Sequence, residues 1–240
     1  MTRRWKWGGI GVACLLSVTL AIGASPLRAD DKDKSKDEAQ EKTHADRVLR
    51  ARDVYVEFVN SKDHEVPKGL RDRAKAIAVF PKVVKGAIGF GGRYGKGVIS
   101  YHMPDGHWSP VTFLTMTGGS WGLQIGVESA DVILYFMTDE SVKSLLQSKF
   151  TLGGKAGVAA GPFGRTAEAD TDVKLNAEIY SYARSKGLFA GVSLEGARVA
   201  PDQESVRDYY GQEVSPQTIL FQGEVPSRPA AGEAFVQVLP

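Results

Sequence analysis

The stretch IAVFPKVVKGAIGFGGRYGKGVISY, at residues 77–101, decides the fold class. It places three short apolar runs (77–80, 86–90 and 97–101) close together, and Gly91-Gly92 between the last two is a turn signal. Runs of this length, rich in β-branched and aromatic residues and separated by glycine, are typical of strands. The stretch therefore predicts consecutive strands of an antiparallel sheet.

The same pattern continues outward from this stretch. Further strands are expected at 111–116, 121–127, 132–137, 177–184 and 188–194. Turn signals separate them at Asp105-Gly106, Gly118-Gly119 and Ser129-Ala130-Asp131. Helical periodicity or capping residues predict helices at 43–61, 67–75, 139–147, 201–210 and 232–239. We therefore predict an α+β fold, one domain over 43–240 with a large, curved antiparallel sheet that approaches a barrel and with flanking helices.

The first 42 residues differ in composition from the rest. Arg3, Arg4 and Lys6 precede an uncharged, mostly apolar run at 10–24, and Ala29 precedes an abrupt change to charge. This is the pattern of a secretory signal peptide at 1–29. Residues 30–42 alternate acids and bases with almost no apolar side chain, so we expect a flexible linker there. Export to the periplasm or outer envelope is the expectation that follows.

Export would also change the charge and thiol content. The whole chain carries 30 basic and 28 acidic groups, a net charge of +2. The first 29 residues hold four basic groups, no acidic group and the only cysteine, Cys14, so removing them leaves a net charge of −2 and no thiol. Nothing in this charge balance suggests a nucleic-acid protein, and any attraction to anions must come from local patches.

Sequence patterns for catalysis and cofactor binding are weak. Residues 118–122, GGSWG, match the nucleophile elbow of α/β-hydrolases, but strand-like residues follow Ser120 and all four histidines precede it. The glycine cluster at 86–97 gives neither a dinucleotide fingerprint nor a P-loop, and close strand packing explains it better. His102 and His107 lack a third metal ligand, and Glu128 with Asp131 is more typical of a turn than of an acid–base pair. We expect no enzyme, metal site or cofactor.

Basic residues form the candidate binding site. Three arginines lie on the helix expected at 43–61, and the others lie near expected turns, where a fold can present charge to anionic headgroups. The alternative is a scatter of solvated side chains. The candidates are Arg47, Arg50, Arg52, Lys82, Lys85, Arg93, Lys96, Arg165, Arg184 and Lys186.

Several blocks of sequence in a fixed order resemble one known family. These blocks are AKAIAVF at 74–80, DGHWSP at 105–110, QIGVESAD at 124–131, TLGG at 151–154, GPFGR at 161–165 and SKGLFAGVSLEG at 185–196. In this order and spacing they resemble the SYLF domain, over about 43–240.

The resemblance implies a non-enzymatic phospholipid-binding module. Eukaryotic members bind phosphoinositides, some also bind and bundle actin and carry SH3 or FYVE domains, and their lipid binding involves an N-terminal amphipathic helix with basic residues. Residues 43–61 match that helix, so Arg47, Arg50 and Arg52 acquire the candidate role. We expect an anionic phospholipid or membrane surface as the partner. The alternative is an envelope protein partner, bound by a soluble module of the same fold. The two differ in whether the apolar stripe of the 43–61 helix inserts into lipid or packs in the core.

Overall fold

The central strands bury both of their faces, and this determines the layout of the domain. In the computed structural model, Ile77 and Val79 of β1 (Ala76–Ile88) belong to one hydrophobic core, whereas Ala78 and Phe80 belong to another on the opposite face. Successive side chains of a strand point to opposite faces, so an unbroken apolar run is needed where both faces are covered. The structure describes residues 29–61, 66–88, 90–120, 126–147, 150–154, 156–162, 177–186 and 188–240.

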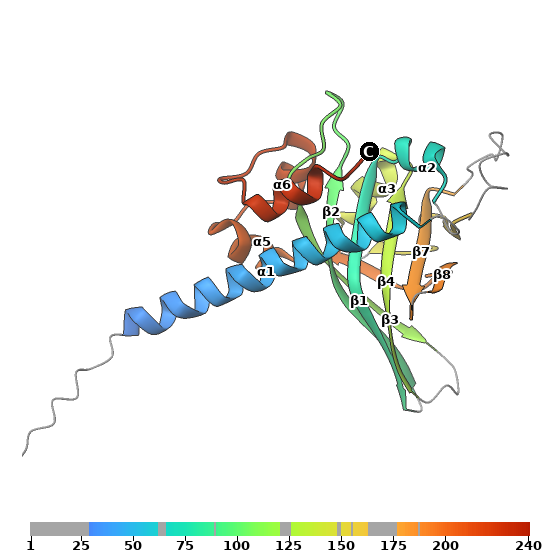
Figure 1. Cartoon of the computed structure of the whole chain (residues 1–240), viewed down its shortest axis with the longest axis horizontal. Helices are drawn as coiled ribbons and strands as arrows, with labels where there is room; N and C mark the ends of the chain where they lie inside the picture. Colours follow the sequence, from blue (N-terminus) through green and yellow to red (C-terminus); the bar gives the residue numbers. More distant parts are fainter. Residues whose placement is uncertain are drawn as a thin grey trace, which may run out of the picture.

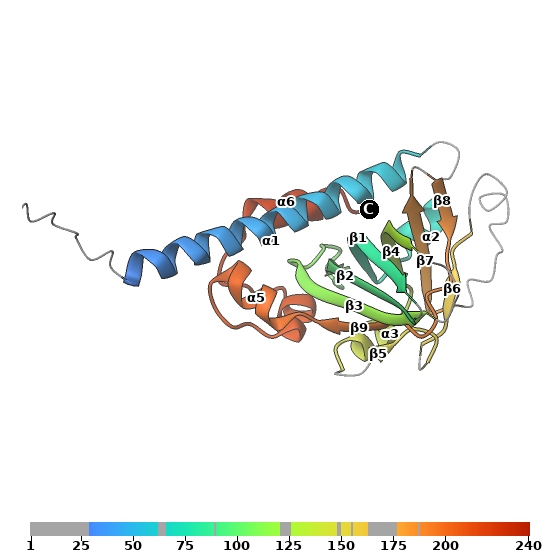
Figure 2. The same cartoon turned by 90° about the horizontal axis from the view of Figure 1, so that it is seen from below.

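Nine strands form one strongly curved sheet that resembles half of a barrel (Figures 1 and 2). The order is β5-β9-β3-β2-β1-β4-β7-β6, and β8 also pairs with β7. Besides β1, the strands are β2 (Phe90–Tyr101), β3 (Thr112–Ser120), β4 (Gly126–Phe136), β5 (Phe150–Thr151), β6 (Val158–Ala160), β7 (Ile179–Ser185), β8 (Leu188–Gly191) and β9 (Arg198–Pro201). The predicted α+β class is confirmed. The sheet is mixed rather than wholly antiparallel, because β6 runs parallel to β7.

Helices cover both faces of the sheet. Helix α1 (Ala29–Val59) crosses one face and contacts α5 and α6 (Figure 2). The other helices are α2 (Lys68–Asp72), α3 (Asp139–Leu145), α5 (Gln203–Tyr210), the π-helix η1 (Thr218–Gln222) and α6 (Ala230–Val236). The predicted end of α5 is confirmed, because Gly211 adopts the left-handed conformation at φ 72°. The π-helix was not predicted. None of the helices in the described part of the chain is both long and apolar enough to cross a membrane.

Helix α1 begins earlier than expected. Residues 30–42, predicted as a flexible linker, continue the helix outward from the body of the domain (Figure 1). The packed part of α1 provides a nucleus, and extending an existing helix costs little. Residues 1–28, which contain the expected signal peptide, lie outside the described residues.

Several glycines predicted as turns lie inside strands. Gly91 and Gly92 pair with β1, and Gly118 and Gly119 pair with β2. Residues 129–131 likewise lie within β4. The runs 77–80 and 86–90 were expected as separate strands, but most of both lies in β1, which is interrupted by an irregularity between Val79 and Val84. One of these glycines, Gly118, serves close packing instead of a turn: a Cβ there would come within 3.1 Å of Arg93 Cγ and 3.3 Å of Ala197 Cα.

Candidate functional site

The structure places the three helix arginines in different environments. Arg47 is buried, its Nη1 donates to Ser205 Oγ at 3.1 Å, and its guanidinium lies 5.4 Å from the centre of the Phe113 ring. Burial lowers the pKa of Arg47. Arg52 forms an ion pair with Asp53 at 2.6 Å, and Arg50 is exposed. The expectation that Arg47 faces solvent is therefore wrong, because this position of α1 turns toward α5 rather than outward.

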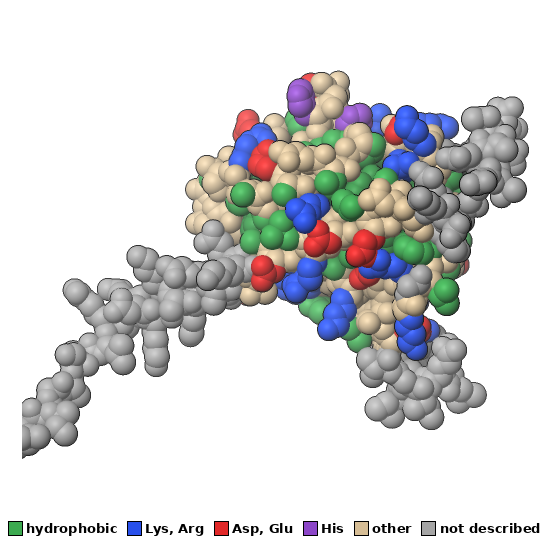
Figure 3. Space-filling model, viewed as in Figure 1, with side chains coloured by type: hydrophobic (Ala, Val, Ile, Leu, Met, Phe, Trp, Pro, Cys, Tyr) green, Lys and Arg blue, Asp and Glu red, His purple; other side chains and the backbone are tan. Residues whose placement is uncertain are grey.

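The apolar stripe of α1 packs in the core. Val48, Ala51, Val54, Tyr55 and Phe58 are all buried against the sheet. The same stripe cannot insert into a bilayer while it is held there. On the face shown in Figure 3, acidic and basic side chains are also interspersed rather than gathered into a basic patch.

Two other candidates on this side of the sheet have acidic partners. Lys96 pairs with the buried Asp202 at 2.9 Å. Arg184 pairs with Asp131 at 2.7 Å and also with Glu57 of α1. These contacts tie α1 and α5 to the sheet, so the two side chains have structural roles.

Lys82 lies at the interruption of β1 and has a positive φ of 62°. Its backbone N–H donates to Asp131 Oδ1 at 3.1 Å, and its side chain is exposed. Arg165 lies outside the described residues.

Lys85, Arg93 and Lys186 converge on the opposite face of the sheet, where they line one cavity of about 430 Å³. The sheet register explains part of this convergence, because Lys85 of β1 lies opposite Arg93 of β2 on one side and opposite Glu128 of β4 on the other. Among the described residues, none of the three basic side chains forms an ion pair. The site therefore carries three available positive charges beside one carboxylate.

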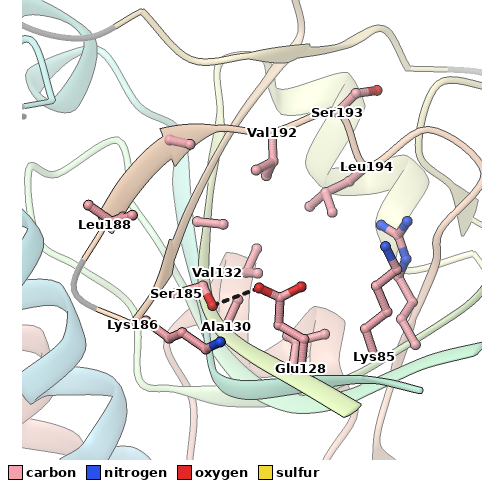
Figure 4. Close-up of a pocket in the computed structure, with 14 residues that line it drawn as sticks. Lys85, Glu128, Ala130, Val132, Ser185, Lys186, Leu188, Val192, Ser193 and Leu194 are labelled. Atoms are coloured by element: carbon pink, nitrogen blue, oxygen red, sulfur yellow. Dashed lines mark hydrogen bonds between the residues drawn. The ribbon is translucent and has the colours of Figure 1, made fainter. Parts of the chain in front are cut away.

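The rest of the cavity is mainly apolar. Figure 4 shows Val192 and Leu194 around the cavity, with Lys85, Glu128 and Lys186 at one end. Ser185 donates to Glu128 Oε1 at 3.1 Å, and Leu188 is 75% exposed. The remaining lining residues are Val83, Ala130, Val132, Ala183, Ala190 and Ser193. An apolar cavity of this size with charge at one end suits an amphiphilic anion.

Sequence reasoning missed the apolar half of this site. Leu188, Ala190 and Val192 alternate along β8 and beyond it, and that period places them on one face. The alternation was visible in the sequence, but the residues lining the opposite wall come from three other strands.

The hydrolase and metal alternatives gain no support from the geometry. Ser120 is the last residue of β3, and the five residues that follow it lie outside the described part of the chain. His102 stacks on Trp108, and His107 lies 3.5 Å from Asp105. In the described ranges, no group of three or more histidine, cysteine, aspartate or glutamate side chains is placed to hold a metal ion.

Comparison with known proteins gives consistent results. The family model Ysc84, described as "Las17-binding protein actin regulator", matches residues 117–240. Human SH3 domain-containing YSC84-like protein 1 is 34% identical over 181 residues, which cover 75% of this chain and 52% of the relative.

Two Saccharomyces cerevisiae proteins are also similar to this chain. LAS seventeen-binding protein 3 is 36% identical over 176 residues, 72% of this chain and 38% of the relative. Protein YSC84 is 38% identical over 172 residues, 70% of this chain and 36% of the relative. The chain thus spans about half the length, or less, of these relatives.

Proposed function

The chain belongs to the Ysc84/SYLF family, and from this premise we propose that it is a non-enzymatic module that binds an anionic phospholipid in the cavity lined by Lys85, Arg93 and Lys186, which we call the lipid cavity. The relatives are named as binding and regulatory proteins, which agrees with a binding role. One observation supports the proposal most: Lys85, Arg93 and Lys186 surround one end of an otherwise mainly apolar cavity of about 430 Å³.

The two halves of the cavity suit the two parts of a lipid. The apolar walls would take an acyl chain, and each methylene removed from water contributes about 0.8 kcal/mol. The basic end would take the charged headgroup, and each Lys or Arg near an anionic lipid contributes about 1 kcal/mol. Glu128 is the one carboxylate among the lining residues, and it accepts a hydrogen bond from Ser185. The three positive charges of the lining therefore outnumber this negative charge by two.

Binding one lipid molecule in this cavity would not require α1 to leave the core. The lipid cavity lies on the face of the sheet opposite to α1. Arg50 is exposed and can still add attraction to a membrane surface. A variant that replaces Arg47, Arg50 and Arg52 together would not separate an effect on binding from one on folding, because Arg47 is buried.

The test is a binding titration with anionic and zwitterionic phospholipids of the same chain length. Replacing Lys85 and Lys186 together with Gln should weaken anionic lipid binding about thirtyfold, which corresponds to about 2 kcal/mol. The matched control replaces Lys75 and Lys143, which are exposed and do not line the lipid cavity. Added salt should reproduce part of the loss in wild type.

A second variant tests the apolar half. Ala190 lines the lipid cavity and is exposed, so Ala190→Phe should fill space without disturbing the core. It should weaken binding of anionic and zwitterionic lipids alike, whereas Ala230→Phe, at the exposed start of α6, should not. Unchanged lipid binding in both the cavity and the lysine variants would exclude the lipid cavity as the lipid site.

The alternative is a protein-interaction module of the cell envelope. The name of LAS seventeen-binding protein 3 and the description of the Ysc84 family model refer to binding a protein, Las17, and the packed stripe of α1 removes one route to a membrane. Wild-type protein that binds no anionic lipid at any salt concentration would favour this alternative.

We also propose that the protein acts after export, in the periplasm or at the outer envelope. The support is the order of residues 1–31, in which basic residues come first, an apolar run follows and charged residues come last. Intact-mass measurement of protein from the native cell should show a chain that begins at Asp30 and has no thiol. A chain that retains Cys14 would contradict this proposal.

A further inference from the structure

One wall of the lipid cavity is formed by β8 and the residues that follow it. Leu188 lies on β8, and Val192 and Leu194 continue the wall beyond the end of that strand (Figure 4). In the described part of the sheet, β8 pairs with β7 alone. Whether this wall can move therefore determines how wide the cavity can become.

A buried hydroxyl fixes the wall at Val192. Ser181 of β7 is fully buried, and its Oγ donates to the carbonyl oxygen of Val192 at 2.5 Å. The Val192 N–H donates back to the Ser181 carbonyl oxygen at 3.3 Å. The same Oγ lies 3.2 Å from the carbonyl oxygen of Ala159 in β6. Moving the wall would leave buried polar groups without partners, which is costly.

The wall also has no space behind it. Side-chain directions alternate along β8, so Gly191 faces away from the cavity that Ala190 lines. A Cβ on Gly191 would come within 2.5 Å of the Gly161 carbonyl oxygen. Val83 and Val132 line the cavity from β1 and β4 and are buried in the core. The cavity is therefore held at its present width from both sides.

The volume of the cavity matches one acyl chain. A methylene group has about the volume of one water molecule in the liquid, about 30 Å³, so the cavity of about 430 Å³ holds about 14 of them. Two chains of that length would need about twice the volume, and the fixed wall leaves no route by which the cavity could supply it.

This difference determines which part of a lipid contributes to binding. Each methylene that enters the cavity tightens binding about fourfold, which corresponds to 0.8 kcal/mol. A methylene of a second chain would stay in water and add nothing. A two-chain lipid therefore gains no affinity from its second chain.

We propose that the lipid cavity accepts only one acyl chain, so that its ligand is an anionic lipid with a single chain rather than a two-chain membrane phospholipid. This inference rests on the proposed function, because it sets the number of chains on the lipid that binds there. A lysophospholipid and a free fatty acid share this chemistry, and Lys85 and Lys186 can pair with phosphate or carboxylate.

The experiment measures binding to the purified full chain by calorimetry, with every probe below the concentration at which it forms micelles. Three probes share a phosphoglycerol headgroup: the octanoyl and decanoyl lysophospholipids and the dioctanoyl phospholipid. Extending the single chain from eight to ten carbons should tighten binding about fifteenfold. Adding a second octanoyl chain should change the affinity by less than about twofold. A dioctanoyl lipid that binds more than about tenfold tighter than its lysophospholipid would overturn the inference.

A wall variant tests whether this cavity sets the limit. In wild type the affinity should rise with chain length up to about 14 carbons and then become constant. Val192→Ala removes two methyl groups from the wall and should extend that limit by about two carbons. The matched control is Val236→Ala, which removes the same atoms from a half-buried position of α6 outside the cavity and should leave the limit unchanged. A limit that neither variant moves, or that both move equally, would overturn the inference.

Failure of the proposed function gives a different result. Wild type would then bind none of the three phospholipids, and decanoic acid would decide the inference. Fatty acid binding with the same limit of about 14 carbons would retain the single-chain cavity and identify a fatty acid as its source. Absence of fatty acid binding would overturn the single-chain cavity together with the proposed function.

Discussion

Gly97 provides the sharpest test of how the sheet is packed. A Cβ at this position would lie 2.5 Å from both the Phe80 ring and the Val79 carbonyl oxygen. Carbon atoms in contact normally lie about 3.5–4.0 Å apart, so the ring would have to move by about 1 Å. Phe80 is fully buried and the carbonyl belongs to the backbone of β1, so neither has space to move.

Gly97→Ala should therefore be among the costlier overpacking changes, lowering the free energy of unfolding by about 3 kcal/mol. For a chain of this size that corresponds to a fall in Tm of about 6–12 °C. The control is Gly86→Ala in β1, where a Cβ would meet nothing within 4 Å. Removing the conformational freedom of a strand glycine should make that variant more stable by about 0.5 kcal/mol.

Urea and thermal unfolding, followed by circular dichroism, measure both changes. Lipid binding measured beside them should be unchanged in folded Gly97→Ala, because Gly97 does not line the lipid cavity. A Gly97→Ala protein within about 0.5 kcal/mol of wild type would refute the close approach of β2 to β1.

Three further predictions concern α1 and α5. Arg47→Met should lower the free energy of unfolding by about 2 kcal/mol through loss of the Ser205 hydrogen bond and the Phe113 contact, whereas Arg50→Met should change it by less than about 0.5 kcal/mol in the same urea titration. Burial, and then the charge of Arg47, lower the pKa of His44 from 6.5, so its protonation opposes folding. Stability should thus fall as the pH drops below 6.5, and His44→Gln should flatten that dependence; an unchanged slope would count against the assignment. Gly211→Ala should lower Tm, at a cost of about 1 kcal/mol, because φ there is 72°; a Tm equal to that of wild type would contradict the cap.

The sequence was sufficient to predict the elements whose signals are local. The apolar stripe of α1, the Gly211 cap of α5 and the short apolar run of β7 each depend on residues a few positions apart. The length of β1 was not predictable in this way. Pro81 and Lys82 interrupt its apolar pattern, and only pairing with β2 and β4 on either side keeps the two halves in one strand.

The same distinction between local and distant signals applies to the candidate site. The residue types were predicted, but their grouping by sequence neighbourhood was wrong. Arg93 and Lys96 were both expected near a turn, yet they are three residues apart in one strand and lie on opposite faces of the sheet. Arg184 and Lys186 also separate, because Arg184 turns to Glu57 and Asp131. Which basic residues remain available depends on acidic partners that are distant in the chain.

The position of α1 limits how the protein could bind lipid. A helix that inserts into a bilayer must expose its apolar stripe, and here Tyr55 and Phe58 of that stripe are at most 1% exposed. Releasing them would expose part of the core around Ile77 and Ile133, at a cost of several kcal/mol. Leu188 is already 75% exposed beside the lipid cavity, so the proposed binding of an acyl chain there would not carry that cost. The geometry therefore favours bringing one lipid into the protein over placing a helix of the protein into the membrane.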